Sequence, residues 1–340
     1  MSKKTPGLTK RGDIWHINKV IKGKRLYEST GTSDLEEAER YLAQRITEFR
    51  GQLIYGERKS YTFIEAATKY LKEVDKKSLD RDAVTLKAAV PIIGDLPLEK
   101  IHMGTLESFI TARKKQGLKN GTINRDLAII SRVLTLAARL WRDEFGNSWM
   151  IEPPLIQLLK SDSRKPYPIN NEEEKRLISE LPKHLQDMVN FALNTGLRES
   201  ELTQLKWSEE KPKLGIFVLS GERTKNGEDR IIPLNSIAIA IIDAQRGKHD
   251  EYVFTFKGQP VRRINGNAWR KARERAGIPQ CRVHDLRHTF GRRLRAAKVS
   301  FENRQDLLGH KSNRITDHYC KAEIAELREA VEKISRVNLA

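Results

Sequence analysis

Apolar and polar residues alternate in two short runs near the start of the chain, at residues 13–20 and 25–30. A period of two predicts a pair of β-strands, with a glycine turn between them. A helical period follows, on the apolar residues Leu35, Ala38, Leu42 and Ile46. Ser33 and Glu36 have the spacing of a capping box at the start of that helix. Residues 1–58 are therefore expected to form a small sheet-plus-helix module.

The pattern of residues 59–160 is helical almost throughout. Gly94, Pro97 and a glycine-containing run at 117–121 predict the turns. The helices expected between them are 63–74, 84–91, 104–116 and 122–141. No cluster of reactive side chains lies in this segment, which is rich in Lys and Arg, so it is expected to be a helical bundle.

A polar, proline-containing run at 160–168 has the composition of a linker and precedes a third segment, which extends from about residue 169 to residue 340. This segment is mostly helical, with one predicted hairpin whose strands are 216–219 and 230–233. The complete chain is expected to be mainly α with small β elements, an α+β fold, and 340 residues suit two or three domains.

An amphipathic helix is expected near the end of the chain, at residues 323–335. Its apolar positions recur at helical spacing and are Ile324, Leu327, Val331 and Ile334. Two alternatives remain open for this stripe. It packs on its own domain, or it docks on a neighbouring protomer.

The charge balance favours a polyanionic partner. The chain has 63 Lys and Arg against 45 Asp and Glu, a net charge of +18, and nucleic acid is the commonest partner of such a surface. A solvated basic surface is the alternative. Two cysteines make no disulfide framework and fit no zinc motif, and no signal peptide or membrane span is visible. We therefore expect a cytoplasmic protein without a membrane partner.

Common enzyme motifs are missing from the sequence. It contains no phosphate-binding P-loop, no dinucleotide fingerprint and no His-Glu-x-x-His zinc helix. An ATPase, a dehydrogenase and a metalloprotease are thereby disfavoured.

Candidate chemistry lies in the third segment. Arg198 follows Gly196, which can end a helix. Taken alone, Arg198 could be an ordinary surface charge paired with Glu201. His284 and Arg287 are three residues apart, so on a helix both could reach one phosphate, although isolated His-x-x-Arg pairs are mostly structural. A further helix ends at a Leu-Gly-His sequence, and a tyrosine follows nine residues after that histidine.

Taken together and in order, these motifs resemble the tyrosine recombinase family, also called the phage integrases. The family pattern of Arg, Lys, His-x-x-Arg, His or Trp, and Tyr matches Arg198, Lys225, His284 with Arg287, His310 and Tyr319. The flanking Gly-Leu-Arg, Thr-Lys-Asn, His-x-Leu-Arg-His and Leu-Gly-His sequences agree. The resemblance covers residues 169–321. It departs at Lys321, where many relatives have His.

The resemblance implies an integrase-type catalytic domain at 161–340. It implies a helical, SAM-like core-binding domain at 59–160 and an arm-type DNA-binding domain at 1–58. These two assignments rest mainly on position and on the predicted elements.

The resemblance also implies a role for each matched residue. Tyr319 would be the nucleophile that forms a 3′-phosphotyrosine, while Arg198 and Arg287 grip the phosphate oxygens. Lys225 would protonate the leaving oxygen, and His284 and His310 would hold the phosphate and assist proton transfer. No metal, ATP or other cofactor is expected, because two guanidiniums supply the charge and the ester conserves bond energy. Glu201 is expected to orient Arg198 or the hairpin, whereas Cys320, His288 and His318 receive no catalytic role.

The implied function is site-specific DNA integration for a phage or mobile element in a bacterial host. The expected partners are double-stranded attachment sites and three further copies of the chain, with a DNA-bending host factor and an excisionase as candidates, in association with the nucleoid. The alternatives are a type IB topoisomerase, a Xer-like chromosome-dimer resolvase, and a DNA-binding regulator with a decayed active site.

Overall fold

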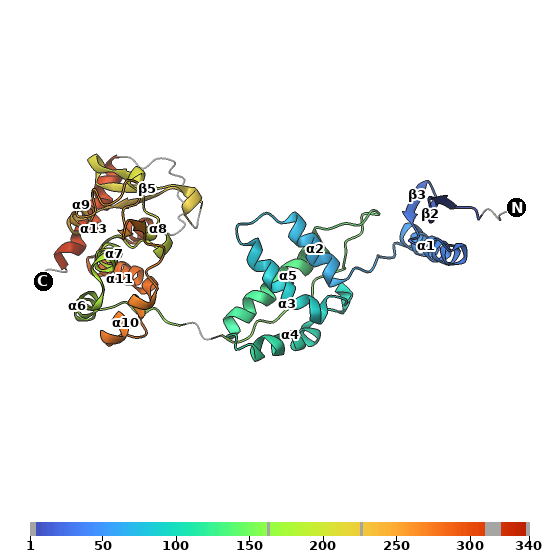
Figure 1. Cartoon of the computed structure of the whole chain (residues 1–340), viewed down its shortest axis with the longest axis horizontal. Helices are drawn as coiled ribbons and strands as arrows, with labels where there is room; N and C mark the ends of the chain where they lie inside the picture. Colours follow the sequence, from blue (N-terminus) through green and yellow to red (C-terminus); the bar gives the residue numbers. More distant parts are fainter. Residues whose placement is uncertain (1–4, 162–163, 225–226, 310–320, 338–340) are drawn as a thin grey trace. The chain divides into compact units, whose positions relative to one another are not determined.

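A computed structural model of the chain describes residues 5–161, 164–224, 227–309 and 321–337, and at 321, 322, 336 and 337 it describes the backbone alone. The chain forms two compact units, Met1–Ser163 and Arg164–Ala340 (Figure 1). The first unit contains two hydrophobic clusters, one in the small N-terminal sheet and helix and one among the helices that follow. The boundary expected near residue 58 lies inside this first unit and stays a prediction.

The N-terminal module is an antiparallel sheet in the order β1-β2-β3, covered on one face by a helix. Its elements are β1 Leu8–Arg11, β2 Ile14–Ile21, β3 Lys24–Ser29 and α1 Leu35–Tyr55. The two predicted strands are confirmed. β1 was not predicted, because Leu8 is its only apolar residue and gives no alternation. Ile17, Leu26 and Leu42 form the core between the sheet and the helix.

The predicted capping box is wrong by one residue. Asp34, not Ser33, is the N-cap of α1, and its carboxylate accepts the backbone N–H of Glu37 at 2.8 Å. The N–H of Asp34 is in turn held by the hydroxyl of Thr32 at 3.1 Å. A carboxylate satisfies the free N–H of the first turn and also interacts favourably with the positive end of the helix dipole, which explains the choice of Asp34.

Four further helices of the first unit pack against one another around a shared hydrophobic cluster. They are α2 Phe63–Glu73, α3 Leu79–Ile93, α4 Met103–Lys115 and α5 Asn120–Arg139. All four were predicted, although α3 begins five residues earlier than expected. Ile123, Leu127 and Ile130 on α5 are fully buried, so α5 supplies much of the core of this helical part.

In its described residues, the second unit is a helical domain with two small antiparallel sheets, one of three strands and one of two. Its helices are α6 Asn171–Glu180, α7 Lys183–Thr195, α8 Glu199–Thr203, α9 Ser236–Asp243, α10 Asn267–Arg275, α11 Val283–Ala296, α12 Phe301–Leu308 and α13 Lys321–Val337. Its strands are β4 Glu210–Lys211, β5 Ile216–Leu219, β6 Arg230–Pro233, β7 Thr255–Phe256 and β8 Gln259–Pro260. The predicted hairpin is confirmed as β5 and β6, and α7 packs against α11 in the middle of the unit.

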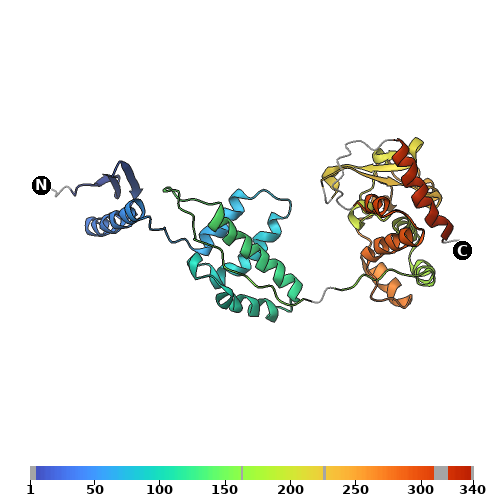
Figure 2. The same cartoon turned by 180° about the vertical axis from the view of Figure 1, so that it is seen from behind.

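The apolar stripe of the C-terminal helix packs on its own domain. Leu327, Val331 and Ile334 of α13 are buried against Phe290 and Leu294 of α11, and Figure 2 shows α13 lying along this unit. This arrangement is the first of the two alternatives, packing of the stripe on its own domain. In the part of the chain that the structure describes, no helix is long and apolar enough to cross a membrane.

Candidate active site

A glycine turn between α7 and α8 places Arg198. Gly196 ends α7 with a φ of 62°, a conformation that favours glycine. A Cβ at this position would lie 2.3 Å from the ring of Phe290 on α11, so a larger residue would also clash. The turn is thus packed directly on α11, and Arg198 follows as the N-cap residue of α8.

A buried carboxylate holds Arg198. Its Nη1 donates to Oε1 of Glu201 at 2.6 Å, and its backbone N–H donates to Oε2 at 2.8 Å. Arg230, the first residue of β6, donates from Nη1 to Oε2 of the same carboxylate at 2.6 Å. Burial alone raises the pKa of Glu201, but the charges of Arg230 and Arg198 and the hydrogen bonds from Arg198 outweigh it and lower the pKa. The expected contact of Glu201 is confirmed with both Arg198 and the hairpin.

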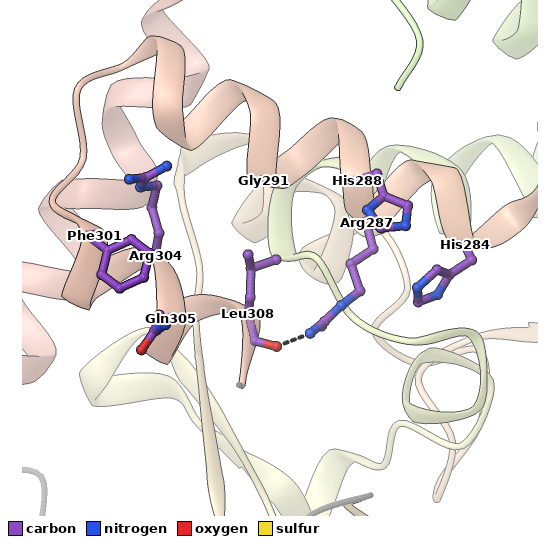
Figure 3. Close-up of a pocket in the computed structure, with 8 residues that line it drawn as sticks. All are labelled: His284, Arg287, His288, Gly291, Phe301, Arg304, Gln305 and Leu308. Carbon is purple, nitrogen blue, oxygen red and sulfur yellow. Dashed lines mark hydrogen bonds between the residues drawn. The ribbon is translucent and has the colours of Figure 1, made fainter. Parts of the chain in front are cut away.

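Helix α11 brings His284 and Arg287 to one face. Both line a cavity of about 300 Å³ (Figure 3), which confirms that the two side chains point to a shared space. The cavity lining consists of His284, Arg287, His288, Gly291, Phe301, Arg304, Gln305 and Leu308. Arg287 is only 5% exposed and donates from Nη1 to the carbonyl of Gly196 at 2.6 Å. His284 lines the cavity and is partly open to solvent, so its imidazole can contact a ligand there.

Three arginines meet the last carbonyls of α12. Arg230 donates from Nη2 to the carbonyl of Leu307 at 2.8 Å, and Arg287 donates from Nη2 to the next carbonyl, that of Leu308. Arg198 reaches the carbonyl of Gly309 at 3.4 Å. Free carbonyls at a helix C-terminus carry partial negative charge, which attracts cations. Side chains from α8, β6 and α11 are thereby gathered at one end of α12.

The electrostatics of this cluster favour an anion. Burial, together with the charges of Arg230 and Arg198, lowers the pKa of Arg287 to about 9, although Glu201 opposes the shift. Burial, followed by the neighbouring His288 and Arg287, also lowers the pKa of His284. The charge of Arg287 is thus held in a poorly solvated place beside Arg198 and Arg230, and a bound phosphate would relieve the repulsion.

Comparison with known proteins fits this arrangement. Residues 168–326 match the Phage integrase family, and residues 7–49 match the Phage integrase N-terminal domain. The chain belongs to the phage integrase family. The integrase of Salmonella phage P22 is 27% identical over 371 residues, covering 97% of this chain and 94% of that protein. The tyrosine recombinase XerA of Thermococcus kodakarensis is 29% identical over 226 residues, covering 63% of this chain and 77% of that protein.

Solved integrases share the fold. The lambda integrase tetramer bound to a Holliday junction has a TM-score of 0.56 at 18% identity, over 93% of this chain and 98% of that chain. The Tn1549 transposon integrase in complex with circular intermediate DNA has a TM-score of 0.58 at 18% identity, over 78% of this chain and 98% of that chain. With the family match, these findings identify the chain as a site-specific tyrosine recombinase.

Half of the predicted catalytic set of this recombinase lies outside the described residues. These residues are Lys225, His310 and Tyr319. Cys320 and His318, which were given no catalytic role, also lie outside the described residues. The strands β5 and β6 flank the segment that contains Lys225. Helix α12 ends at Leu308, and its C-cap residue Gly309, with a φ of 54°, directly precedes His310 in the chain. The catalytic roles of all six residues stay predictions.

Two residues of the recombinase site were not found from the sequence. His288 was set aside, yet it lines the cavity, with its ring edge-on to His284 at 4.9 Å between centroids. Its spacing of four from His284 could have indicated a shared helix face. Arg230 was not considered, although a charged residue at a buried position of a predicted strand is unusual. Among the described residues, no group of three or more His, Cys, Asp or Glu has a metal-binding arrangement.

Proposed function

We propose that the recombinase cuts and rejoins double-stranded DNA at attachment sites through a 3′-phosphotyrosine on Tyr319, as the integrase of a phage or other mobile element. The observation that carries this proposal is the convergence of Arg198 and Arg287 beside His284. Two guanidiniums with fixed partners, in a cluster short of negative charge, suit one phosphodiester. Preorganised charge of this kind is often the largest catalytic contribution.

The proposed reaction needs only groups of the chain and the DNA. The phenolate oxygen of Tyr319 attacks the scissile phosphorus, the bond to the 5′-oxygen breaks, and Lys225 gives that oxygen its proton. Arg198 and Arg287 stabilise the charge on the nonbridging oxygens, and His284 and His310 hold the phosphate and assist proton transfer. Attack by a 5′-hydroxyl on the phosphotyrosine reverses these steps and reseals the strand, so no ATP is consumed.

The N-terminal module is proposed as a separate DNA reader, covering residues 1–58. The sheet face opposite α1 is exposed and carries Arg11, Asn18, Arg25 and Tyr27. Nε of Arg25 donates to Oδ1 of Asn18 at 2.9 Å, and the guanidiniums of Arg25 and Arg11 lie 5.1 and 5.3 Å from the ring centre of Tyr27. Cationic and amide groups on a flat sheet face suit phosphates and base edges in a groove.

The remaining parts of the proposal follow from this organisation. Residues 59–160 are proposed as the helical core-binding domain and 161–340 as the catalytic domain. The active assembly is proposed to be a homotetramer on two DNA sites, as in the solved lambda integrase tetramer on a Holliday junction. A DNA-bending host factor and an excisionase are the proposed accessory partners, and the bacterial nucleoid is the proposed location.

One experiment separates this function from its alternatives. Purified protein is incubated, in EDTA and without ATP, with two plasmids carrying attachment sites and in parallel with a supercoiled plasmid lacking them. Site-dependent recombinants are the expected result, because no step requires a metal or a nucleotide. Relaxation of the site-free plasmid alone would instead support a type IB topoisomerase, and DNA binding without cleavage would support a decayed regulator.

A requirement for residues 1–58 distinguishes an integrase from a Xer-like resolvase. Recombination of full attachment sites is expected to need this module, whose sequence matches an integrase N-terminal domain. Full recombination by a protein that lacks the module would favour the resolvase.

A further inference from the structure

Arg230 is a buried arginine that the proposed catalytic set does not include. Its side chain is only 6% exposed, at the first position of β6, where it pairs across the hairpin with Leu219. Burying a guanidinium is costly unless its donors are paired. A hydrophobic residue would fill an ordinary strand position at lower cost, so the contacts of Arg230 indicate what it does.

The Nη1 atom of Arg230 contacts the carboxylate that also binds Arg198. Its Nη1 donates to Oε2 of Glu201 at 2.6 Å, while Arg198 holds Oε1 of the same carboxylate at 2.6 Å. The two arginines therefore share one buried carboxylate, with one oxygen assigned to each guanidinium. With Arg230 in place, Glu201 has a fixed rotation, and that rotation sets the direction in which Arg198 points.

The Nη2 atom of Arg230 contacts the C-terminal turn of α12. Its Nη2 donates to the carbonyl of Leu307 at 2.8 Å. Its stem lies so close to Gly309 that a Cβ there would be 2.7 Å from Cδ and Nε of Arg230. This contact keeps the next two carbonyls within reach of Arg287 and Arg198, directly before His310 in the chain.

We propose that Arg230 is a positioning residue for strand cleavage, which aligns Arg198 through Glu201 and fixes the end of α12 that precedes His310. The inference rests on the proposed function, because it concerns the step in which Arg198 neutralises the scissile phosphate. Arg230 itself reaches no substrate in this account. It acts through the two elements that it ties together, α8 and α12.

The test compares Arg230→Met and Arg230→Lys with a matched control, Arg293→Met. Arg293 is similarly buried, with 7% of its side chain exposed, and it pairs with Glu174 of α6 rather than with Glu201. Single-turnover cleavage is measured on a suicide substrate at saturating protein, together with binding of the core site. We expect Arg230→Met to slow cleavage by about 10²-fold, the loss typical of one preorganised donor, with binding changed less than about threefold.

A substrate with a neutral methylphosphonate at the scissile position separates positioning from general damage. This group lacks the charge that Arg198 neutralises, so the defect of Arg230→Met should shrink to about tenfold or less. An equal defect on both substrates, or an equal loss in Arg293→Met, would overturn the inference. If Arg230→Met does not fold, Arg230→Lys is used, because its ammonium can retain one of the two contacts. Wild-type rates in a folded Lys variant would also overturn the inference.

Failure of the inference can be told from failure of the proposed function. Wild-type protein and Arg198→Ala are measured in the same series. Cleavage that depends on Arg198 but not on Arg230 overturns only the positioning role, whereas cleavage independent of Arg198 and Tyr319 overturns the proposed function itself.

Discussion

Arg164 donates two hydrogen bonds to the carboxylate of Asp285, from Nη1 to Oδ1 at 3.3 Å and from Nη2 to Oδ2 at 2.8 Å. The same carboxylate accepts the backbone N–H groups of Tyr167 at 3.1 Å and Arg282 at 2.8 Å. Asp285 stands between His284 and Arg287 in the first turn of α11. The start of the second unit is therefore tied to the helix turn that supplies two predicted catalytic residues.

Asp285→Asn should destabilise the second unit by about 1.5–3 kcal/mol, because a buried charged acceptor with four donors is lost. Burial alone raises the pKa of Asp285, but Arg164 and the two backbone N–H groups outweigh it and lower the pKa. The carboxylate thus contributes stability above its unfolded pKa of about 3.9 and loses it as the pH falls through the lower folded value. The free energy of unfolding should depend less on pH in this acidic range in the variant.

Urea unfolding between pH 3 and pH 7 measures both effects of this change. Glu180→Gln is the control, since its pair with Arg275 is solvent-exposed and worth little. A pH dependence identical to that of wild type in Asp285→Asn would contradict the role given to this carboxylate.

Tyr319→Phe should keep the affinity for DNA and lose cleavage, because it removes only the hydroxyl oxygen that becomes bonded to phosphorus. A suicide substrate should trap covalent protein with wild type and not with the variant, as seen on a denaturing gel. Covalent complex in the Phe variant would assign the nucleophile to another residue. Cys320→Ser is the matched control and should cleave as wild type does.

Lys225→Ala should slow cleavage of ordinary DNA strongly, by about 10²–10⁴-fold, because the leaving 5′-oxygen would depart without its proton donor. A 5′-phosphorothiolate at the scissile position should restore most of the rate, since a thiolate leaves without protonation. The two substrates are compared in single-turnover assays. A defect of equal size on both would give Lys225 a different role.

Deletion of residues 1–58 should spare cleavage of isolated core sites and abolish integration at full attachment sites. The exposed sheet face with Arg11 and Arg25 is the physical basis, because its phosphate contacts release counterions on binding. Footprints on full sites should lose protection outside the core, and the salt dependence of binding should become less steep. Arg25→Ala, with the domain intact, should show a weaker form of the same loss. Unchanged footprints would contradict the assignment.

Local sequence patterns predicted part of the site, whereas its long-range contacts could not be predicted from the sequence. The β5–β6 hairpin, the Gly196 turn and the shared face of His284 and Arg287 depend on spacings of a few residues, and all are confirmed. The contacts of Arg230 with Glu201 and Leu307 join residues 29 and 77 apart, and the pair of Arg164 and Asp285 spans 121. No period or motif encodes such distances, because tertiary packing decides them.

The amphipathic pattern near the C-terminus likewise predicted the helix but not the partner of its apolar face. The stripe on α13 predicted a helix with a buried face, but the sequence contains no information on whether that face is covered by the same copy or by another. Val331 shares its buried cluster with Phe290 and Leu294, which belong to a helix earlier in the chain. Only the folded arrangement of α11 and α13 decides between the two alternatives.

Truncation after Lys321 should therefore unfold the second unit or remove its cooperative melting. Leu327, Val331 and Ile334 are 4%, 0% and 0% exposed, and losing such side chains from a packed core costs about 2–5 kcal/mol each when truncated to Ala. Three such losses are comparable to the whole stability of a domain, about 5–15 kcal/mol. Thermal melting followed by circular dichroism measures the effect. Leu327→Ala alone should give a smaller loss in the same direction, whereas Glu329→Gln, at an exposed position, should melt as wild type does. A truncated protein that melts cooperatively at the wild-type temperature, with a defect only in pairing two DNA sites, would show that α13 acts between protomers.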